Sequence, residues 1–449
     1  MHKTDEPQGR FTALLPFLIF LIFYLGLSLC ANDFYKVPMP VAFIIASAAA
    51  FLLETRKKLA DKVELYAKGM GDTNIMIMCL VFILAGAFAT VAKGMGAVDS
   101  AVVIARNLMP DNLLLSGLFL VSCFISLAIG TSCGTIATLT PIAVGLGTAT
   151  GLPMELLIGA VVGGAMFGDN MSIISDTTIA ASRTQGVAMR DKFLMNLRIA
   201  LPAAIVTLLI YLITGRSSGE VTEVAAITGR DVLLILPYLS VLLCALLGLN
   251  VMAVLFFGLV MAVILGIVTG KFDIWGVLKL TGDGCLGMSE TLIVALLAGG
   301  LLSMVRSSGG IRFLLDNVEK FIKSPRACEC GVALFVTAVN LFTANNTVAI
   351  VIAGPVAKEL SQKYTCSPRR IASILDTASC IVQGLIPYGA QILIAVGVTQ
   401  SAGLKLSTLS LIGTMYYQMI MLVMLIVFIL LPRKKSDNTC EAAWIDQNM

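Results

Sequence analysis

The chain contains one histidine, His2, and only 13% of its 449 residues are charged. The apolar part of the sequence therefore has no imidazole, so any proton carried there must bind a carboxylate or a lysine. The 11 cysteines include no C-x-x-C pair. Cysteines inside apolar runs, such as Cys79 and Cys380, fit small packing residues better than disulfides or metal ligands. There is no G-x-x-x-x-G-K-[ST] phosphate loop, so the sequence gives no sign of transport driven by nucleotide hydrolysis.

Apolar residues make up 58% of the chain, more than a soluble protein of this length could bury. The net charge of +4 is spread over the polar segments and gives no sign of a nucleic-acid partner. We therefore predict an all-α polytopic membrane protein that is bound to the lipid bilayer and is not an enzyme. A crossing needs about 20 apolar residues. Ten full crossings are predicted, at 11–30, 38–53, 75–93, 153–182, 193–214, 231–249, 250–270, 288–305, 368–398 and 408–431.

Two further apolar segments, 112–150 and 327–357, are each too long for one span and are interrupted near the middle by small polar residues. We predict a re-entrant hairpin at each segment. Two full spans in each segment are the alternative, and both arrangements assign every other loop to the same side of the membrane. Basic residues test the orientation, since they concentrate on the cytoplasmic side. The loops assigned inside are basic-rich, for example Arg56 to Lys68, Arg183 to Arg198 and Lys358 to Arg370, whereas the outer loops are sparse. Both termini are therefore expected to be cytoplasmic, with tails at 1–10 and 432–449 and no cleaved signal peptide.

The two halves of the sequence resemble each other weakly at a nearly constant offset. Ala85-Gly86 matches Ala298-Gly299, Pro141 matches Pro355, and Pro153 matches Pro368. The first repeat, 11–214, would cross the membrane an odd number of times, so the second, 231–431, would be inverted, with 215–230 as the linker. Inverted repeats with interrupted helices are typical of secondary transporters that bind their solute near the membrane midplane. Chance matching of apolar residues is the alternative.

Polar residues inside the predicted spans mark the candidate ion- or substrate-binding site. Asp169 is the first candidate, because a carboxylate at membrane depth costs about 2.5 to 3.5 kcal/mol and calls for a partner. The preceding glycines can break the helix and expose carbonyls that bind a cation. Carboxylate, hydroxyl and amide oxygens nearby suit a hard cation such as sodium; they belong to Asn170, Ser172, Ser175, Asp176, Thr177 and Thr178. Alternatively, Asp169 caps the second half-helix and Asp176 pairs with Arg183.

The second half offers a comparable set. Asp376 lies about two turns into its span, and Gly384 to Pro387 should break that helix, leaving Tyr388 and Gln391 near the centre. Asp169, Asp176 and Asp376 are the candidate sodium ligands. The hairpin tips are also polar, with Thr131, Ser132 and Thr135 in the first half and Asn345, Asn346 and Thr347 in the second. Half-helix ends could bind an ion or an anionic group there, while hydrogen bonding between helices is the alternative role.

At these residues the chain resembles the NhaC-type sodium/proton antiporters of bacteria, within the broader ion transporter superfamily. The shared motifs include Gly130-Thr131-Ser132, Phe167-Gly168-Asp169, Ser175-Asp176-Thr177-Thr178 and Thr343-Ala344-Asn345. The chain departs from the family where Cys133, Asn170, Ile173 and Tyr388-Gly389 stand, at positions usually held by Trp, Lys, Pro and Trp-Asn. The resemblance implies an inner-membrane transporter with re-entrant hairpins, and the family also includes carriers of organic acids and probable amino-acid carriers.

Two functions remain open at this stage. The first is sodium/proton antiport, in which one carboxylate binds the two ions in turn. The second is sodium- or proton-coupled transport of a small organic acid or amino acid held at the hairpin tips. A channel is disfavoured by broken inverted repeats and the lack of a repeated pore ring. No cofactor is expected beyond sodium as the transported or coupling ion, and the glycine pairs leave a homodimer open.

Overall fold

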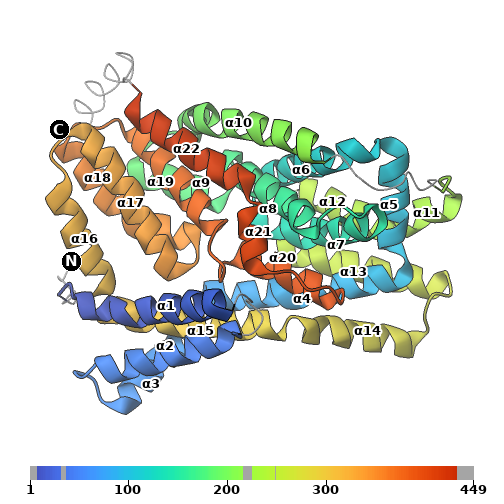
Figure 1. Cartoon of the computed structure of the whole chain (residues 1–449), viewed down its shortest axis with the longest axis horizontal. Coiled ribbons are helices and arrows are strands. Elements are labelled where there is room, and N and C mark those ends of the chain that lie inside the picture. The colour runs from blue at the N-terminus through green and yellow to red at the C-terminus, as the bar shows by residue number, and fades with distance from the viewer. Residues whose placement is uncertain (1–7, 32–36, 216–224, 248, 432–449) are drawn as a thin grey trace.

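The computed structural model describes residues 8–31, 37–215, 225–247 and 249–431, and these residues are organised into helices joined by short connections (Figure 1). The predicted tails at 1–10 and 432–449 and the linker at 215–230 fall largely outside the described residues. The first half of the chain contains η1 (Phe11–Leu14), α1 (Leu15–Ala31), α2 (Met39–Leu53), α3 (Leu59–Met70), α4 (Thr73–Met95), α5 (Ala97–Leu108), α6 (Asp111–Ile129), α7 (Ser132–Thr150), α8 (Met154–Met171), α9 (Asp176–Gln185) and α10 (Met189–Thr214).

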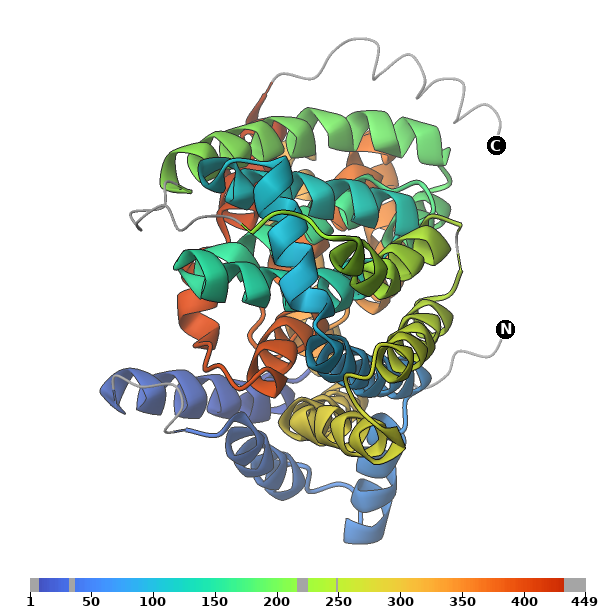
Figure 2. The same cartoon turned by 90° about the vertical axis from the view of Figure 1, so that its right-hand side faces the viewer.

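The second half continues with the remaining helices. They are α11 (Gly229–Leu234), α12 (Leu236–Leu246), α13 (Val251–Val268), α14 (Ile274–Gly287), α15 (Ser289–Ser307), α16 (Gly310–Phe321), α17 (Pro325–Thr343), α18 (Asn346–Lys363), α19 (Pro368–Gln383), α20 (Ala390–Ser401), α21 (Thr408–Gly413) and α22 (Tyr416–Leu430). Segments from the two halves lie together: α4 packs along α13 and α14, and α3 packs on α15 (Figure 2).

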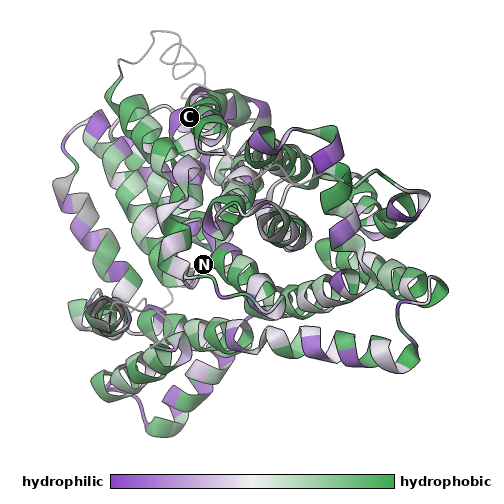
Figure 3. Ribbon diagram, turned by 45° about the vertical axis from the view of Figure 1, so that its right-hand side comes forward, coloured by the Kyte–Doolittle hydropathy of each residue, from purple (hydrophilic) through white to green (hydrophobic). Residues whose placement is uncertain are grey.

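The helices have the length and composition of membrane spans. Among the described residues, eight helical segments are long and apolar enough to cross a bilayer, and four shorter apolar helices accompany them. Large apolar side chains also face outward, as Leu52 does with 78% exposure and Val268 with 74%. Most of the helical ribbon accordingly has the colour of hydrophobic residues (Figure 3). An apolar exterior of this kind is stable only in lipid, which confirms the prediction of an all-α polytopic membrane protein.

Both segments predicted to be broken are interrupted, although the first interruption follows Met171 and not the glycines before Asp169. α8 ends at Met171 and α9 begins at Asp176, so residues 172–175 interrupt the segment 153–182. α19 ends at Gln383 and α20 begins at Ala390, so residues 384–389, which include Pro387, interrupt the segment 368–398. Proline lacks the N–H that would continue the helical ladder, which explains the second break. Non-helical backbone of this kind is tolerated at membrane depth because surrounding protein supplies its hydrogen bonds.

Each predicted hairpin is a pair of helices, α6–α7 and α17–α18, that turns through one residue in the left-handed region. Gly130 has φ 75° at the first turn and Ala344 has φ 47° at the second. The arms are 18 or 19 residues long, about 28 Å at 1.5 Å per residue. That length suits either a full span or a deep re-entrant arm. The choice between these two arrangements therefore stays a prediction.

Matched contacts tie each hairpin to its broken helix. Ser126 Oγ on α6 donates to Ala165 O on α8 at 2.5 Å, and Asn340 Nδ2 on α17 donates to Ser379 O on α19 at 2.8 Å. Both pairs span 39 residues, and each residue of the second pair lies 214 positions after its counterpart in the first. This correspondence supports the predicted repeat, although it leaves the inverted orientation a prediction.

Candidate ion-binding site

Asp169, in the last turn of α8, is enclosed by hydroxyl groups from the hairpin and from the helix break. Asp169 is only 5% exposed. Ser132 Oγ, at the start of α7, donates to Oδ2 at 2.7 Å, and Ser175 Oγ, from the break, donates to Oδ1 at 2.5 Å. Ser175 Oγ also lies 2.9 Å from Thr177 Oγ1. The predicted residues therefore meet around one buried carboxylate.

Asp376, on α19, has a different environment because a lysine contacts it. Lys192 Nζ on α10 forms an ion pair with Asp376 Oδ2, and both residues are at most 1% exposed. The same oxygen accepts from Asn196 Nδ2 at 2.9 Å and from Asn170 Nδ2 at 3.1 Å. Cys380 Sγ lies 3.7 Å from Oδ1. Asp376 is thus already neutralised by a resident cation.

Lys192 also binds the interrupted α8–α9 segment. Its Nζ donates to Asn170 O at 2.8 Å and to Thr178 Oγ1 at 2.6 Å. Asn196, one turn later on α10, donates to the same Asn170 carbonyl at 3.0 Å. A carbonyl near the end of a helix lacks its intrahelical partner. These two α10 side chains therefore satisfy the backbone near the first helix break.

Two glutamines connect Asp169 to the second half of the chain. Gln391 Nε2 on α20 donates to Ser132 Oγ at 2.9 Å, and Gln383 Nε2 at the end of α19 donates to Gln391 Oε1 at 2.8 Å. Gln383 Nε2 also donates to Ala344 O, at the second hairpin turn, at 2.9 Å. A continuous chain of hydrogen bonds therefore joins Asp169 to both broken helices and both hairpin tips. Gln383 lies 214 positions after Asp169, the same offset that relates the two halves. The second half therefore has an amide at the position that corresponds to the Asp169 carboxylate.

The remaining predicted residues of the tips have mostly structural contacts. Asn345 Oδ1 accepts from Val348 N at 3.0 Å and caps α18, and Asn346 Nδ2 lies 3.8 Å from Cys380 Sγ. In the first tip, Thr135 Oγ1 donates to Thr131 O at 3.1 Å. Tyr388 OH donates to Leu341 O at 2.6 Å. Thr347 contributes a backbone N–H, which donates to Asn346 Oδ1 at 3.1 Å.

Two predicted residues lie beside the cluster without joining it. Asp176 is exposed in the first turn of α9, and within the described residues no hydrogen bond or ion pair to Asp169 or to Arg183 involves it. Ser172 is 1% exposed, and its Oγ has no hydrogen-bond partner in the described part of the chain. A buried hydroxyl without a partner, at the first residue of the break, can bind a water or an ion.

Sequence reasoning placed Lys192 in a cytoplasmic loop and overlooked it as a site residue. The structure corrects this placement, because α10 already begins at Met189 and buries the ammonium. Lys192 and Asn196 are four residues apart and so share one helix face. A lysine and an asparagine on one face at the start of an apolar span could have identified Lys192 as a site residue. Gln383 had no comparable signal, since an isolated amide in a span is common.

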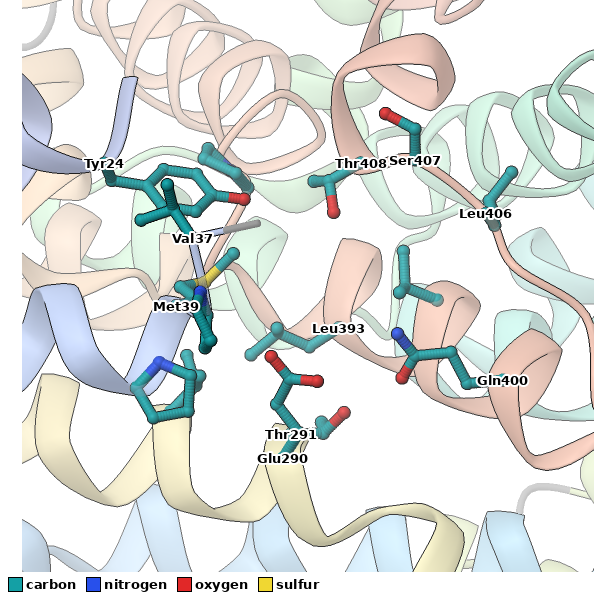
Figure 4. Close-up of a pocket in the computed structure, with 15 residues that line it drawn as sticks. Tyr24, Val37, Met39, Glu290, Thr291, Leu393, Gln400, Leu406, Ser407 and Thr408 are labelled. Carbon is teal, nitrogen blue, oxygen red and sulfur yellow. The ribbon is translucent and has the colours of Figure 1, made fainter. Parts of the chain in front are cut away.

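Two cavities are each lined by a residue of the second helix break, Pro387 in one and Tyr388 in the other. The first, of about 210 Å³, is lined by Glu290 and Thr291 of α15, by Gln400 of α20 and by Pro387; we call it the Glu290 cavity (Figure 4). The second, of about 320 Å³, is lined by Arg306 of α15, by Lys68 and Asp72 near the α3–α4 connection, and by Asn345 and Tyr388; we call it the Arg306 cavity. Ala344, whose carbonyl accepts from Gln383, also lines the Arg306 cavity.

The arrangement suits the binding of a small cation. Asp169 supplies two oxygens, the hydroxyl oxygens of Ser132 and Ser175 contact them, and the hydroxyl of Thr177 contacts Ser175. Hard cations prefer such ligands. In the described residues, Asp169 has no ion-pair partner within 4.0 Å, whereas the buried carboxylates of Asp376 and Glu329 pair with Lys192 and Arg370. Within the described residues, Asp169 is therefore a buried carboxylate that no cationic side chain pairs with.

Comparisons with known proteins agree with this chemistry. The Na+/H+ antiporter family matches residues 15–216 and 221–431. The Na(+)/H(+) antiporter NhaC of Bacillus subtilis (strain 168) is 27% identical over 388 residues, which cover 79% of this chain and 84% of the relative. NhaC of Alkalihalophilus pseudofirmus is 25% identical over 79% of this chain and 82% of the relative. The malate-2H(+)/Na(+)-lactate antiporter of Bacillus subtilis (strain 168) is 20% identical over 93% of this chain and 95% of the relative.

The fold and the buried carboxylate define a multi-pass secondary active transporter of the membrane, not an enzyme. The chain belongs to the Na+/H+ antiporter family, which confirms the resemblance noted from its motifs. Sodium and protons are accordingly the ions that it exchanges.

Proposed function

We propose that Asp169 is the residue at which sodium and protons are exchanged. The observation that supports this assignment is its isolation: it is a buried carboxylate with hydroxyl ligands and, among the described residues, no cationic partner. A carboxylate that holds sodium repels a proton, and a protonated carboxyl no longer attracts sodium. Competition for one group therefore produces exchange without any further coupling device.

The other groups of the cluster have defined roles in this mechanism. The hydroxyls of Ser132 and Ser175 donate to the carboxylate when it is empty and turn their oxygens to sodium when it is bound. Asn170 links the cluster to Asp376 and Lys192. Alternating exposure of Asp169 then requires the α8–α9 and α19–α20 breaks to move relative to their hairpins, as expected for a central site in a secondary transporter.

The decisive experiment uses purified protein in liposomes that contain a pH-sensitive dye. A sodium gradient should drive proton movement, a potassium gradient of the same size should not, and Asp169→Asn should abolish the response. Asp176→Asn is the matched control, because this exposed carboxylate lies outside the cluster, and it should leave exchange intact. Sodium-driven proton movement that persists in correctly folded Asp169→Asn would reject the assignment.

Transport of a small organic acid or amino acid is the second candidate. The Arg306 cavity favours it, since about 320 Å³ exceeds the room a bare ion needs, and Arg306 and Lys68 could attract a carboxylate. The similarity to a malate and lactate antiporter points in the same direction. Sodium-dependent solute uptake that is independent of pH would establish this function. Saturable proton exchange without any added solute would argue against it.

We also propose that both termini are cytoplasmic and that the protein resides in a bacterial inner membrane. The basic loops support this orientation, because lysine and arginine concentrate on the cytoplasmic side. The burial of Lys192 removes one charge from the basic segment 183–198 but leaves Arg183, in the last turn of α9, and Arg190, in the first turn of α10, exposed. Protease or thiol-reagent access to engineered terminal tags in right-side-out vesicles measures the orientation directly.

A further inference from the structure

The hydrogen bonds between Asp169 and the second hairpin can run in one direction only, and a backbone carbonyl sets that direction. The Gln383 side chain lies 2.9 Å from Ala344 O, and a carbonyl can only accept, so the atom that faces it is the amide nitrogen. One of the two protons on that nitrogen goes to Ala344 O. The other goes to the Gln391 side chain at 2.8 Å, which therefore presents its oxygen to Gln383.

The same reasoning fixes the Ser132 hydroxyl as a donor. Because the Gln391 oxygen faces Gln383, the Gln391 nitrogen faces Ser132 Oγ at 2.9 Å and donates to it. The single proton of the Ser132 hydroxyl goes to Asp169 Oδ2 at 2.7 Å. Reversing this proton would require both glutamines to turn over, which would set the Gln383 oxygen against the Ala344 carbonyl. Ser132 is therefore held as a donor from the second half of the chain.

The other oxygen of the carboxylate has a partner that can reverse. Ser175 Oγ lies 2.5 Å from Asp169 Oδ1 and 2.9 Å from Thr177 Oγ1, and either hydroxyl can be the donor in the second contact. When Asp169 is ionised, Ser175 donates to Oδ1 and accepts from Thr177. When a proton is bound to Oδ1, Ser175 accepts from it and donates to Thr177. The two hydroxyls therefore suit both states of the carboxyl group.

We propose that Gln391 is a positioning residue that holds Ser132 as a donor to Asp169 Oδ2 and so confines the exchangeable proton to Oδ1. This inference rests on the proposed exchange of ions at Asp169 and adds the atom that carries the proton. A proton on Oδ2 would point at the proton of Ser132, whereas a proton on Oδ1 points at the oxygen of Ser175. The Ser132 oxygen keeps its second lone pair for sodium.

A fixed donor also affects the competition between the two ions. Hydrogen bonding to the ionised form of a carboxyl group favours that form, so Ser132 helps sodium to displace the proton from Asp169. Other titratable groups of the described residues lie near this carboxylate and act on it as well. They include the Cys133 thiol on α7, the exposed Asp176 on α9, and the ion pair of Lys192 with Asp376, which has the Cys380 thiol beside it. The substitutions below leave all of these groups in place.

The first test titrates Asp169 without transport. Infrared spectra of the purified protein over a range of pH contain the C=O band of protonated carboxyl groups, and the part that is missing from Asp169→Asn belongs to Asp169. Gln391→Met removes the amide and keeps the length of the side chain. Its midpoint should rise by about one pH unit, which is a tenfold change in proton binding.

Gln185→Met is the matched control for this substitution. Gln185 is also a buried amide, but it donates to Gly354 O on α18 and lies outside the chain of hydrogen bonds to Asp169. The control should titrate like the wild type. An unchanged midpoint in folded Gln391→Met, or an equal rise in the control, would overturn the positioning role.

The second test compares the two serines, because only one of them can reverse. Ser132→Ala removes a hydroxyl that only donates to Asp169, so the midpoint should rise as it does in Gln391→Met. Ser175→Ala removes a hydroxyl that suits both states of the carboxyl group, so the midpoint should change little. Equal shifts in the two serine variants would reject the confinement of the proton to Oδ1.

The third test separates positioning from a general loss of structure. In Gln391→Met the apparent KM for sodium should rise several-fold at acidic pH, where protons compete, and match the wild type at alkaline pH. A KM that rises equally at every pH would contradict the proposal. The infrared midpoints do not depend on transport. If folded Asp169→Asn still exchanged ions, the function proposed for Asp169 would fail, while the midpoint shift in Gln391→Met would still report the direction of the hydrogen bonds.

Discussion

Lys192 and Asp376 form an ion pair in the interior of the protein, between α10 and α19. The pair is excluded from water, so its two charges have only each other and the surrounding amides for solvation. The two candidate carboxylates of the site therefore have different partners. Asp376 is paired with the Lys192 ammonium, whereas Asp169 accepts hydrogen bonds from serine hydroxyls. In the proposed mechanism, this difference assigns a structural role to Asp376 and the exchange of ions to Asp169.

Breaking that pair should be costly. Lys192→Met leaves Asp376 as a buried, uncompensated charge and should lower the free energy of unfolding by about 3 to 5 kcal/mol. Asp376→Asn should cost a similar amount by isolating the ammonium. The double variant Lys192→Met with Asp376→Asn removes both charges and should recover much of the loss. Thermal unfolding in detergent measures all three, and a double variant no more stable than the single ones would show that the charges do not act as a pair.

The serines around Asp169 should set the apparent KM for sodium. In the proposed mechanism each serine gives one oxygen ligand to bound sodium, so Ser132→Ala and Ser175→Ala should each raise the apparent KM, about tenfold for each 1.4 kcal/mol of binding free energy lost. Ser126→Ala is the control, because its hydroxyl bonds to the Ala165 carbonyl instead. It should reduce thermal stability slightly and leave the KM unchanged. Equal effects on KM from all three substitutions would contradict a direct role for the site serines. Initial rates of sodium-driven acidification over a range of sodium concentrations supply the measurement.

The hairpin turns should respond oppositely to substitution. Ala344 adopts a left-handed conformation, which costs a residue with a Cβ roughly 1 to 2 kcal/mol. Ala344→Gly should therefore stabilise the protein by up to about 1 kcal/mol, after allowing for the greater freedom of glycine in the unfolded chain. Gly130→Ala should destabilise it, since the new Cβ would lie 2.7 Å from Ile174 Cγ1. Unfolding midpoints of the two variants, measured side by side, test the contrast.

The sequence was enough to predict that two segments are broken and that two others turn at small polar residues, because these signals are local. Pro387 lies inside the second break, and small polar residues follow one another at the tips. The glycines that end at Gly168 mark the first broken segment but not the place of its break, because α8 continues through Gly168 to Met171. The Asp169 cluster was predictable for the same reason, since Ser175 lies only six residues away. The partnership of Asp376 with Lys192 was not, because the two residues are far apart in the chain and the lysine lies near a predicted loop. The chain of Gln383 and Gln391 depends likewise on how the two halves pack.

Gly168 should tolerate no side chain, because α6 crosses α8 at this position with its backbone in contact. A Cβ on Gly168 would lie 2.4 Å from Leu127 N, which is backbone and cannot move aside as a flexible side chain would. Overpacking commonly costs about 1 to 3 kcal/mol, and the shift needed here would also displace Asp169, the next residue. Gly168→Ala should therefore lower both thermal stability and exchange. Gly282→Ala is the matched control, since nothing lies within 4 Å of its Cβ and alanine favours the α14 helix. The control should be neutral or slightly stabilising, and a Gly168→Ala protein as stable and active as that control would contradict the close packing.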